Sequence, residues 1–389
     1  MFLLLLALIY VCFISLGLPD SLLGSAWPVL HMDIGVPVSY AGVISMVISL
    51  GTIVSSLLSD TMSKKLGTGK LTVISVFMSA IALFGFSVSN SYWLLLLWAI
   101  PYGLGAGGVD AVLNNYVAVH YKAQHMSWLH CFWGVGASIS PYIMSFSLVR
   151  LDSWSKGYLI VALIQIVLAF FVLLSLPLWK KSEEMDKEEG IWAEPLKIRE
   201  IFSIPGALPC FITFFAYCAF ELTASLWASS FLVQTRGISV EIASAFASMF
   251  YIGITVGRGI NGFFAMRFSD RLLVRIGLGV IAAGVVLMFL PGDMLVLAGF
   301  VIAGLGCAPI YPCVIHMTPD IFGKEKSQAL IGFQVAFAYV GFCVMPPLFG
   351  FIAEYTSIAL LPVYLLALLV LMTVMHEVMA VKTGKQIPA

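Results

Sequence analysis

Charged residues are scarce in this chain. Only 10% of its residues are Asp, Glu, Lys or Arg, whereas a soluble domain carries roughly 25%. The two signs balance at 20 each, so there is no basic excess with which to hold nucleic acid. Hydrophobic residues make up 61% of the 389 residues, and the mean hydropathy is +1.02. Such a chain cannot cover a water-facing surface. A soluble enzyme is therefore excluded, and a polytopic membrane protein is expected.

The chain also lacks the short patterns of common metal and nucleotide sites. Its seven cysteines form no CxxC or Cys/His spacing, and no HExxH occurs. The segment Gly67–Lys70 is not a P-loop, and the GxGxxG match at Gly103–Gly108 lies inside an apolar run with no preceding strand. We therefore predict no metal, no cofactor, no catalytic residue and no enzymatic activity.

Long charge-free stretches predict the membrane spans. A helix needs about 20 apolar residues to cross the bilayer. The N-terminal run lacks a basic start and is longer than 15 residues, so we interpret it as a span rather than a signal peptide. Twelve spans are predicted, near 1–27, 38–60, 71–88, 92–118, 127–149, 157–179, 206–233, 241–266, 271–290, 294–318, 327–353 and 357–380.

Lys and Arg in the loops predict the orientation, because they are enriched on the cytoplasmic side. With the N-terminus inside, sixteen of the 20 fall in inner loops and three, Arg150, Lys156 and Arg236, in outer loops. The sequence therefore predicts a protein of the cell (inner) membrane with both termini in the cytoplasm.

The most highly charged segment divides the chain. Twelve of the 21 residues at 180–200 are charged. We predict an N-terminal six-helix bundle at 1–179, a cytoplasmic linker at 180–205 that can include a surface helix, and a C-terminal six-helix bundle at 206–389.

The two halves echo each other. Gly103-Leu104-Gly105 is matched by Gly304-Leu305-Gly306, and Gly136 with Pro141 by Gly341 with Pro346. Paired Gly and Pro interruptions in corresponding spans are typical of transporters built from repeats, with the binding site between the repeats.

Two loops resemble the signature of the major facilitator superfamily. SLLSDTMSKKLG at 56–67 resembles GxLaDrxGrk, with Asp60 as the acid and Lys64 and Lys65 as the bases, although two serines replace glycines. The corresponding loop at 262–271 keeps Arg267 and Arg271 but has Met where the acid belongs. This resemblance implies an all-α membrane protein with twelve helices in two six-helix bundles. It also implies a gating role for these acidic and basic residues, in which Asp60 latches the cytoplasmic side.

Within that superfamily the chain resembles the fucose-permease-like sugar/proton symporters. The segments that carry this resemblance are GLPDSLLGSAWP at 17–28, the Asp110–Asn114 pair, WLHCFWGVGASISP at 128–141, YCAFELTASLW at 217–227, VGRGINGF at 256–263, GLGCAPIYP at 304–312 and GFQVAFAYVGFCVMPPLFG at 332–350. One departure is that the helix-1 acid of that family falls one turn beyond Asp20, at Gly24. The resemblance implies proton-coupled uptake of a sugar or similar small polar solute by alternating access.

Ionisable groups inside spans are costly, by ~2.5–3.5 kcal/mol, and so mark candidate sites. Asp110 and Asn114 lie one turn apart on one helix face. We expect Asp110 to carry the coupling proton, with a structural hydrogen bond as the alternative. Asp20, after Pro19, can bind solute, carry a proton or cap a broken helix. His130 can relay protons or play a structural role.

The second half offers candidate groups for solute binding. Glu221 can accept hydrogen bonds from neighbouring hydroxyls, or it can be a buried contact between helices. Trp227 or Tyr251 can pack on a sugar ring. Arg258 needs a partner, either Asp110 or Glu221, and can instead belong to a cytoplasmic gate. The predicted solute-binding residues are Glu221, Asn114, Trp227, Tyr251, Gln334, and Tyr311 at a predicted Tyr311-Pro312 helix break.

The alternative function is a proton-antiport exporter of drugs or metabolites. An antiporter would carry GPxxGG in the fifth span, but residues 140–145 read SPYIMS, without those glycines. Sodium instead of proton coupling stays open. The expected partners are the solute, the coupling ion and membrane lipid, and we expect a monomer.

Overall fold

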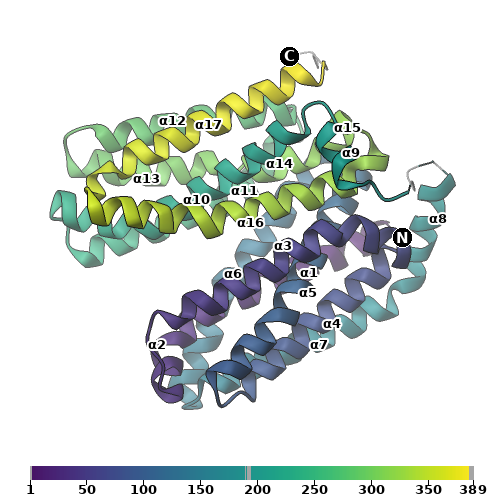
Figure 1. Ribbon diagram of the computed structural model, residues 1–389, viewed down its shortest axis with the longest axis horizontal. Coiled ribbons are helices and arrows are strands. Elements are labelled where there is room, and N and C mark those ends of the chain that lie inside the picture. The colour runs from purple at the N-terminus through teal and green to yellow at the C-terminus, as the bar shows by residue number, and fades with distance from the viewer. Residues whose placement is uncertain (1, 189, 191–193, 385–389) are drawn as a thin grey trace. The chain divides into compact units, whose positions relative to one another are not determined.

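The computed structural model describes residues 2–188, 190 and 194–384, and its regular elements within these residues are helices (Figure 1). In the N-terminal half they are α1 (Phe2–Asp20), α2 (Leu22–Ile34), α3 (Tyr40–Leu66), α4 (Thr68–Ser87), α5 (Tyr92–His120), α6 (Ala123–Arg150), α7 (Trp154–Leu174) and α8 (Leu176–Glu188). In the C-terminal half they are α9 (Ile198–Ser203), α10 (Ala207–Arg236), α11 (Val240–Phe264), α12 (Asp270–Phe289), α13 (Asp293–Cys307), α14 (Ile310–His316), α15 (Thr318–Phe322), α16 (Lys324–Tyr355), the 3₁₀ turn η1 (Ile358–Leu360) and α17 (Leu361–Lys382).

Eleven helical segments among the described residues are long and apolar enough to cross a membrane. The remaining predicted span, 241–266, corresponds to α11, a helix of 25 residues. The prediction of an all-helical, multi-pass membrane protein is confirmed. The physical reason for the helices is that a backbone in lipid can satisfy its polar groups only in helices or closed barrels.

Two predicted spans are interrupted. The first consists of α1 and α2, which are separated at Ser21, and the tenth consists of α13 and α14, which are separated at Ala308-Pro309. The break predicted at Tyr311-Pro312 was therefore placed three residues too late. Pro309 precedes α14, whereas Pro312 lies in its first turn, where a missing N–H is tolerated because those groups have no helical acceptor.

The chain divides into two compact units. Unit 1 comprises Met1–Val117, Leu129–Leu196 and Lys324–Ala336, and unit 2 comprises Ala118–Trp128, Lys197–Gly323 and Phe337–Ala389. Within unit 1, α4 runs along α7, and within unit 2, α12 runs along α13 and α10 along α17 (Figure 1). Each unit thus contains most of one sequence half, together with a short segment from the other half.

The first pair of echoing glycines makes equivalent contacts in the two units. A Cβ atom added at Gly103 of α5 would lie 2.1 Å from the carbonyl oxygen of Ile48 in α3. A Cβ added at Gly304 of α13 would lie 2.4 Å from the carbonyl oxygen of Phe250 in α11. The space beside these glycines is therefore filled by a neighbouring helix rather than left open for a solute.

The second pair behaves in the same way. A Cβ added at Gly136 of α6 would lie 2.0 Å from the carbonyl oxygen of Ile14 in α1. A Cβ at Gly341 of α16 would lie 2.4 Å from the carbonyl oxygen of Phe215 in α10. Both sequence echoes therefore correspond to close backbone contacts that only glycine permits.

The start of the charged linker is an ordered part of unit 1. Trp179 of α8 is buried against Gly69 in the first turn of α4, and Tyr116 donates a hydrogen bond to Ser182 at 2.8 Å. The Glu183 carboxylate accepts the Gly69 N–H at 3.3 Å, which places an acid at the N-terminus of α4. Burial raises the pKa of Glu183, and hydrogen bonds from the α4 backbone oppose that rise. The predicted surface helix is thus present, and it docks on the bundle.

Candidate solute and proton site

The end of α1 presents an acid to two aromatic donors. Asp20 is the last residue of α1. Its Oδ1 accepts a hydrogen bond from the Tyr102 hydroxyl of α5 at 3.1 Å, and its Oδ2 accepts one from Trp133 Nε1 of α6 at 2.9 Å. Asp20 itself is exposed. Side chains from two other helices therefore hold both carboxylate oxygens.

Asp110 lies in a buried chain of hydrogen bonds. Asn114 Nδ2 donates to Asp110 Oδ1 at 2.8 Å and to its backbone oxygen at 3.0 Å. His130 Nε2 lies 3.0 Å from Asn114 Oδ1 and donates to it. Asp110 is 8% exposed, Asn114 0% and His130 5%. The structure therefore brings together three of the predicted residues.

The donor and acceptor order of these hydrogen bonds limits whether they can conduct a proton. His130 donates to the Asn114 amide, which in turn donates to Asp110. A carboxamide does not gain and lose protons near neutral pH. These hydrogen bonds are therefore suited to orienting the Asp110 carboxylate rather than to conducting a proton from His130. The coupling role of His130 stays a prediction.

Glu221 and Arg258 form the charged centre of unit 2. Arg258 Nη2 of α11 lies 3.8 Å from Glu221 Oε2 of α10, and both side chains are buried. Arg258 also donates to the Tyr217 hydroxyl at 3.3 Å. Of the two partners that the sequence allowed for Arg258, the structure places Glu221 beside it.

A polar stripe extends from this ion pair. Ser225, one turn after Glu221, donates to the hydroxyl of Tyr251 in α11 at 3.0 Å. Tyr251 is 41% exposed. The side chains at positions 217, 221 and 225 of α10 therefore face those at positions 251 and 258 of α11, because residues four apart share a helix face.

The remaining predicted solute-binding residues lie in different surroundings. Trp227 Nε1 donates to the backbone oxygen of Pro346 at 3.0 Å, so this ring is held against α16. The ring centroids of Tyr311 and Tyr217 are 6.1 Å apart, which places Tyr311 beside the Arg258 group. Gln334 is fully buried in α16. Tyr311 therefore adjoins the Glu221 group.

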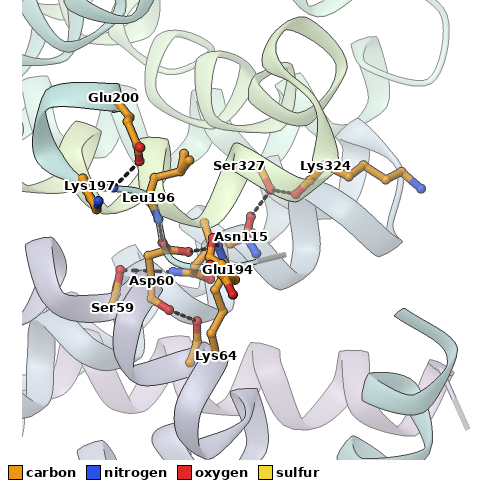
Figure 2. A network of polar contacts seen from close by, with 12 residues as sticks. Ser59, Asp60, Lys64, Asn115, Glu194, Leu196, Lys197, Glu200, Lys324 and Ser327 are labelled. Carbon is orange, nitrogen blue, oxygen red and sulfur yellow. Dashed lines mark hydrogen bonds and ion pairs between the residues drawn. The ribbon is translucent and has the colours of Figure 1, made fainter. Parts of the chain in front are cut away.

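Figure 2 shows the network around the predicted gating acid. Lys64 Nζ lies 2.8 Å from Asp60 Oδ1, and Asp60 Oδ2 accepts the backbone N–H of Leu196 at 3.1 Å. Lys64 also donates to the backbone oxygen of Glu194 at 3.0 Å. The end of α3 therefore holds the linker through both members of its ion pair.

The first turns of α16 join the same unit. Gln328 Nε2 donates to Ser59 Oγ at 3.1 Å, and Ser327 donates to Asn115 Oδ1 of α5 (Figure 2). Three segments that are far apart in the sequence thus meet at the end of α3.

The other predicted gating bases differ from Lys64 in their surroundings. Lys65 and Arg267 are exposed, and Arg271 lies partly buried in the first turn of α12. Arg258 belongs to the Glu221 group described above.

Sequence reasoning missed several partners. Tyr102 and Trp133 both donate hydrogen bonds to Asp20. The sequence signal for them was their position near predicted site residues, because Tyr102 lies eight residues before Asp110 and Trp133 three residues after His130. His316 Nδ1 lies 2.6 Å from Asp270 Oδ2. No short sequence motif predicts these contacts, because each joins two different helices.

Two repeated halves, each with glycines that admit a neighbouring helix, define a membrane transporter built from repeats. Residues 9–220 and 209–386 each match the family model described as Major Facilitator Superfamily. The chain therefore belongs to the Major Facilitator Superfamily, a family of transporters rather than enzymes.

The similar proteins are distant in sequence. The chain is 23% identical to the glucose/mannose transporter GlcP of Bacillus subtilis over 90% of this chain and 88% of the relative. It is also 23% identical to bypass of stop codon protein 6 of Saccharomyces cerevisiae over 90% of this chain and 77% of the relative. The crystal structure of the E. coli fucose:proton symporter FucP superimposes with a TM-score of 0.76 at 14% identity, covering 96% of this chain and 98% of that chain. The predicted major facilitator fold is confirmed.

Proposed function

We propose that this transporter couples proton entry to the uptake of a sugar or similar small polar solute by alternating access. The observation that carries the proposal is the environment of Asp110. It is buried, and within the described residues every side-chain hydrogen bond to its carboxylate and to that of Asp20 comes from a neutral group. Burial among neutral groups permits a carboxyl group to exist with or without its proton.

The sugar in this proposal is supported by two kinds of observation. Two of the similar proteins are a glucose/mannose transporter and a fucose:proton symporter. In unit 2, Glu221 can accept hydrogen bonds from hydroxyl groups, and the exposed ring of Tyr251 can pack on the apolar face of a sugar. Arg258 keeps a positive charge beside Glu221.

The remaining assignments follow from the sequence and stay proposals. The chain comprises an N-terminal bundle at 1–179, a cytoplasmic linker at 180–205 and a C-terminal bundle at 206–389, and both termini are cytoplasmic in the cell membrane. Asp60 and Lys64 act on that cytoplasmic side through the linker. The transporter works as a monomer.

Transport into proteoliposomes tests the proposal. Purified protein would be reconstituted, and uptake of a panel of labelled sugars would be followed with an imposed pH gradient, with a sodium gradient, and with neither. Uphill accumulation of a sugar driven only by an inward proton gradient is the expected result. Accumulation driven by sodium would overturn the proton assignment. Export of drug-like compounds driven by an inward proton gradient, without sugar uptake, would instead establish the antiport function.

A further inference from the structure

The end of α1 contains a backbone defect. Pro19 has no N–H, so the carbonyl oxygen of Ser15, four residues earlier, loses its helical donor. Gln165 of α7 supplies a replacement, since its Nε2 donates to the Ser15 backbone oxygen at 2.7 Å. Gln165 is only 3% exposed in a helix that is otherwise strongly apolar. A buried amide in such a helix is costly unless it is hydrogen-bonded, and this contact meets that requirement.

Helix α6 fixes the other side of the same segment. A Cβ atom added at Gly17 would lie 2.1 Å from the backbone oxygen of Trp133, so α1 and α6 touch directly there. The indole of the same tryptophan donates to Asp20. The last turn of α1 is therefore held between α6 and α7, and the acid lies one residue beyond the proline.

A small cavity adjoins the defect. Its walls include Ser15, Pro19, Tyr102 and Gln165. The Ser15 hydroxyl is buried and has no hydrogen-bond partner within the described part of the chain. Tyr102 lines this cavity and also donates to Asp20. The Gln165–Ser15 contact and the Tyr102–Asp20 contact therefore border the same small cavity.

We propose that Gln165 is a positioning residue: it supplies the donor that Pro19 removes and thereby fixes the end of α1 where Asp20 meets Tyr102 and Trp133. This inference deepens the proposed function and rests on it for the role of Asp20. It assigns a role to Gln165, a buried polar side chain of α7 that the sequence alone did not explain.

A double-mutant cycle tests the contact itself. Gln165→Met keeps the volume and removes the donor, and Pro19→Ala restores the backbone N–H to Ser15. Thermal unfolding would be measured for both single variants and for the double variant. We expect Gln165→Met to lower the Tm by about 2–4 °C in the wild-type background and to have little effect beside Pro19→Ala. Pro28→Ala is the matched control, because it removes a proline from α2 without changing the donor to Ser15. Equal effects of Gln165→Met in all three backgrounds would overturn the inference.

Solute binding tests the positioning of Asp20. The probe is the labelled sugar that the proteoliposome panel identifies as transported. We expect Gln165→Met to weaken affinity for this sugar about tenfold and to shift the pH profile of binding in the same direction as Asp20→Asn. The Asp20→Asn/Gln165→Met double variant should be no worse than Asp20→Asn alone. If Gln165→Met leaves affinity and pH profile unchanged while Asp20→Asn alters them, Gln165 repairs the helix but does not position the acid, and the inference fails.

The outcome of the Asp20 variant separates the two proposals. If Asp20→Asn transports and binds like the wild type, the role of Asp20 in the proposed function is overturned, and the positioning role falls with it. If Asp20→Asn is impaired but the Tm effects of Gln165→Met are the same in every background, only the Gln165 inference is overturned.

Discussion

The candidate acids of the two units differ in their neighbours. In unit 1, Asp110 accepts its side-chain hydrogen bond from a neutral amide, and Asp20 accepts from a phenol and an indole. In unit 2, Glu221 lies 3.8 Å from the guanidinium of Arg258. We therefore propose that the acids of unit 1 exchange the coupling proton and that the Glu221–Arg258 pair of unit 2 contacts the solute.

The strongest test of this division is Asp110→Asn. The amide cannot carry a proton, so we expect gradient-driven accumulation to be abolished. Counterflow exchange should continue, because it needs binding and reorientation but no net proton movement. Both are measured in proteoliposomes with labelled solute. A variant that accumulates solute uphill like the wild type would move the proton to another group, with Asp20 the next candidate.

Removing the cation of unit 2 should have the next largest effect. Arg258→Met leaves Glu221 buried without its partner, and breaking a buried pair in this way costs about 3–5 kcal/mol. We expect a large loss of thermal stability in detergent, measured by unfolding. The double variant Glu221→Gln/Arg258→Met removes both charges and should recover much of that loss. Equal destabilisation of the single and double variants would show that the ion pair is not the cause.

Neutralising the acid of unit 2 should weaken binding without removing coupling. Glu221→Gln keeps the size and one acceptor, but charge-assisted hydrogen bonds are roughly twice as strong as neutral ones. We expect about tenfold weaker solute affinity with its pH dependence retained, measured by binding at several pH values. Intact affinity with a lost pH dependence would reverse the roles of Glu221 and Asp110. If neither changes, Glu221 is a structural contact.

The smallest effect is expected at His130. His130→Gln can still donate to Asn114, so the orientation of Asp110 should be kept and accumulation should change by about twofold or less. His130→Leu removes the donor and serves as the comparison, with a larger loss expected. The assay is initial uptake under a fixed pH gradient. Complete loss of coupling in His130→Gln would instead establish His130 as a proton relay.

Much of the fold was predictable because its signals are local in the chain. The lengths of the apolar runs and the absence of charge within them predict helices that cross a membrane. The paired glycines predicted a repeat, and the structure places each of the four at a close contact with a neighbouring helix. The exact helix breaks were less predictable, since Pro309 precedes a helix whereas Pro101 and Pro141 lie inside the continuous helices α5 and α6.

The site was predictable only in part. The Asp110–Asn114 contact follows from one-turn spacing, which the sequence displays directly. Three other contacts do not follow from the sequence. They are the pairing of Arg258 with Glu221, the hydrogen bond of Trp227 to α16, and the hydrogen bond of Gln165 to Ser15. These contacts depend on how far each helix is rotated and at what depth it crosses its neighbour.

The sequence by itself therefore determined that the chain is helical, crosses the membrane many times, repeats its glycine contacts and buries a few costly charged groups. Only the tertiary structure decided which polar groups of different helices meet. Two residues on one helix are related by its fixed period, but residues on different helices are brought together by side-chain packing along the whole length of both. That packing brings Tyr102 and Trp133 to Asp20, pairs Glu221 with Arg258, and brings Gln165 to the carbonyl group that Pro19 leaves without a donor.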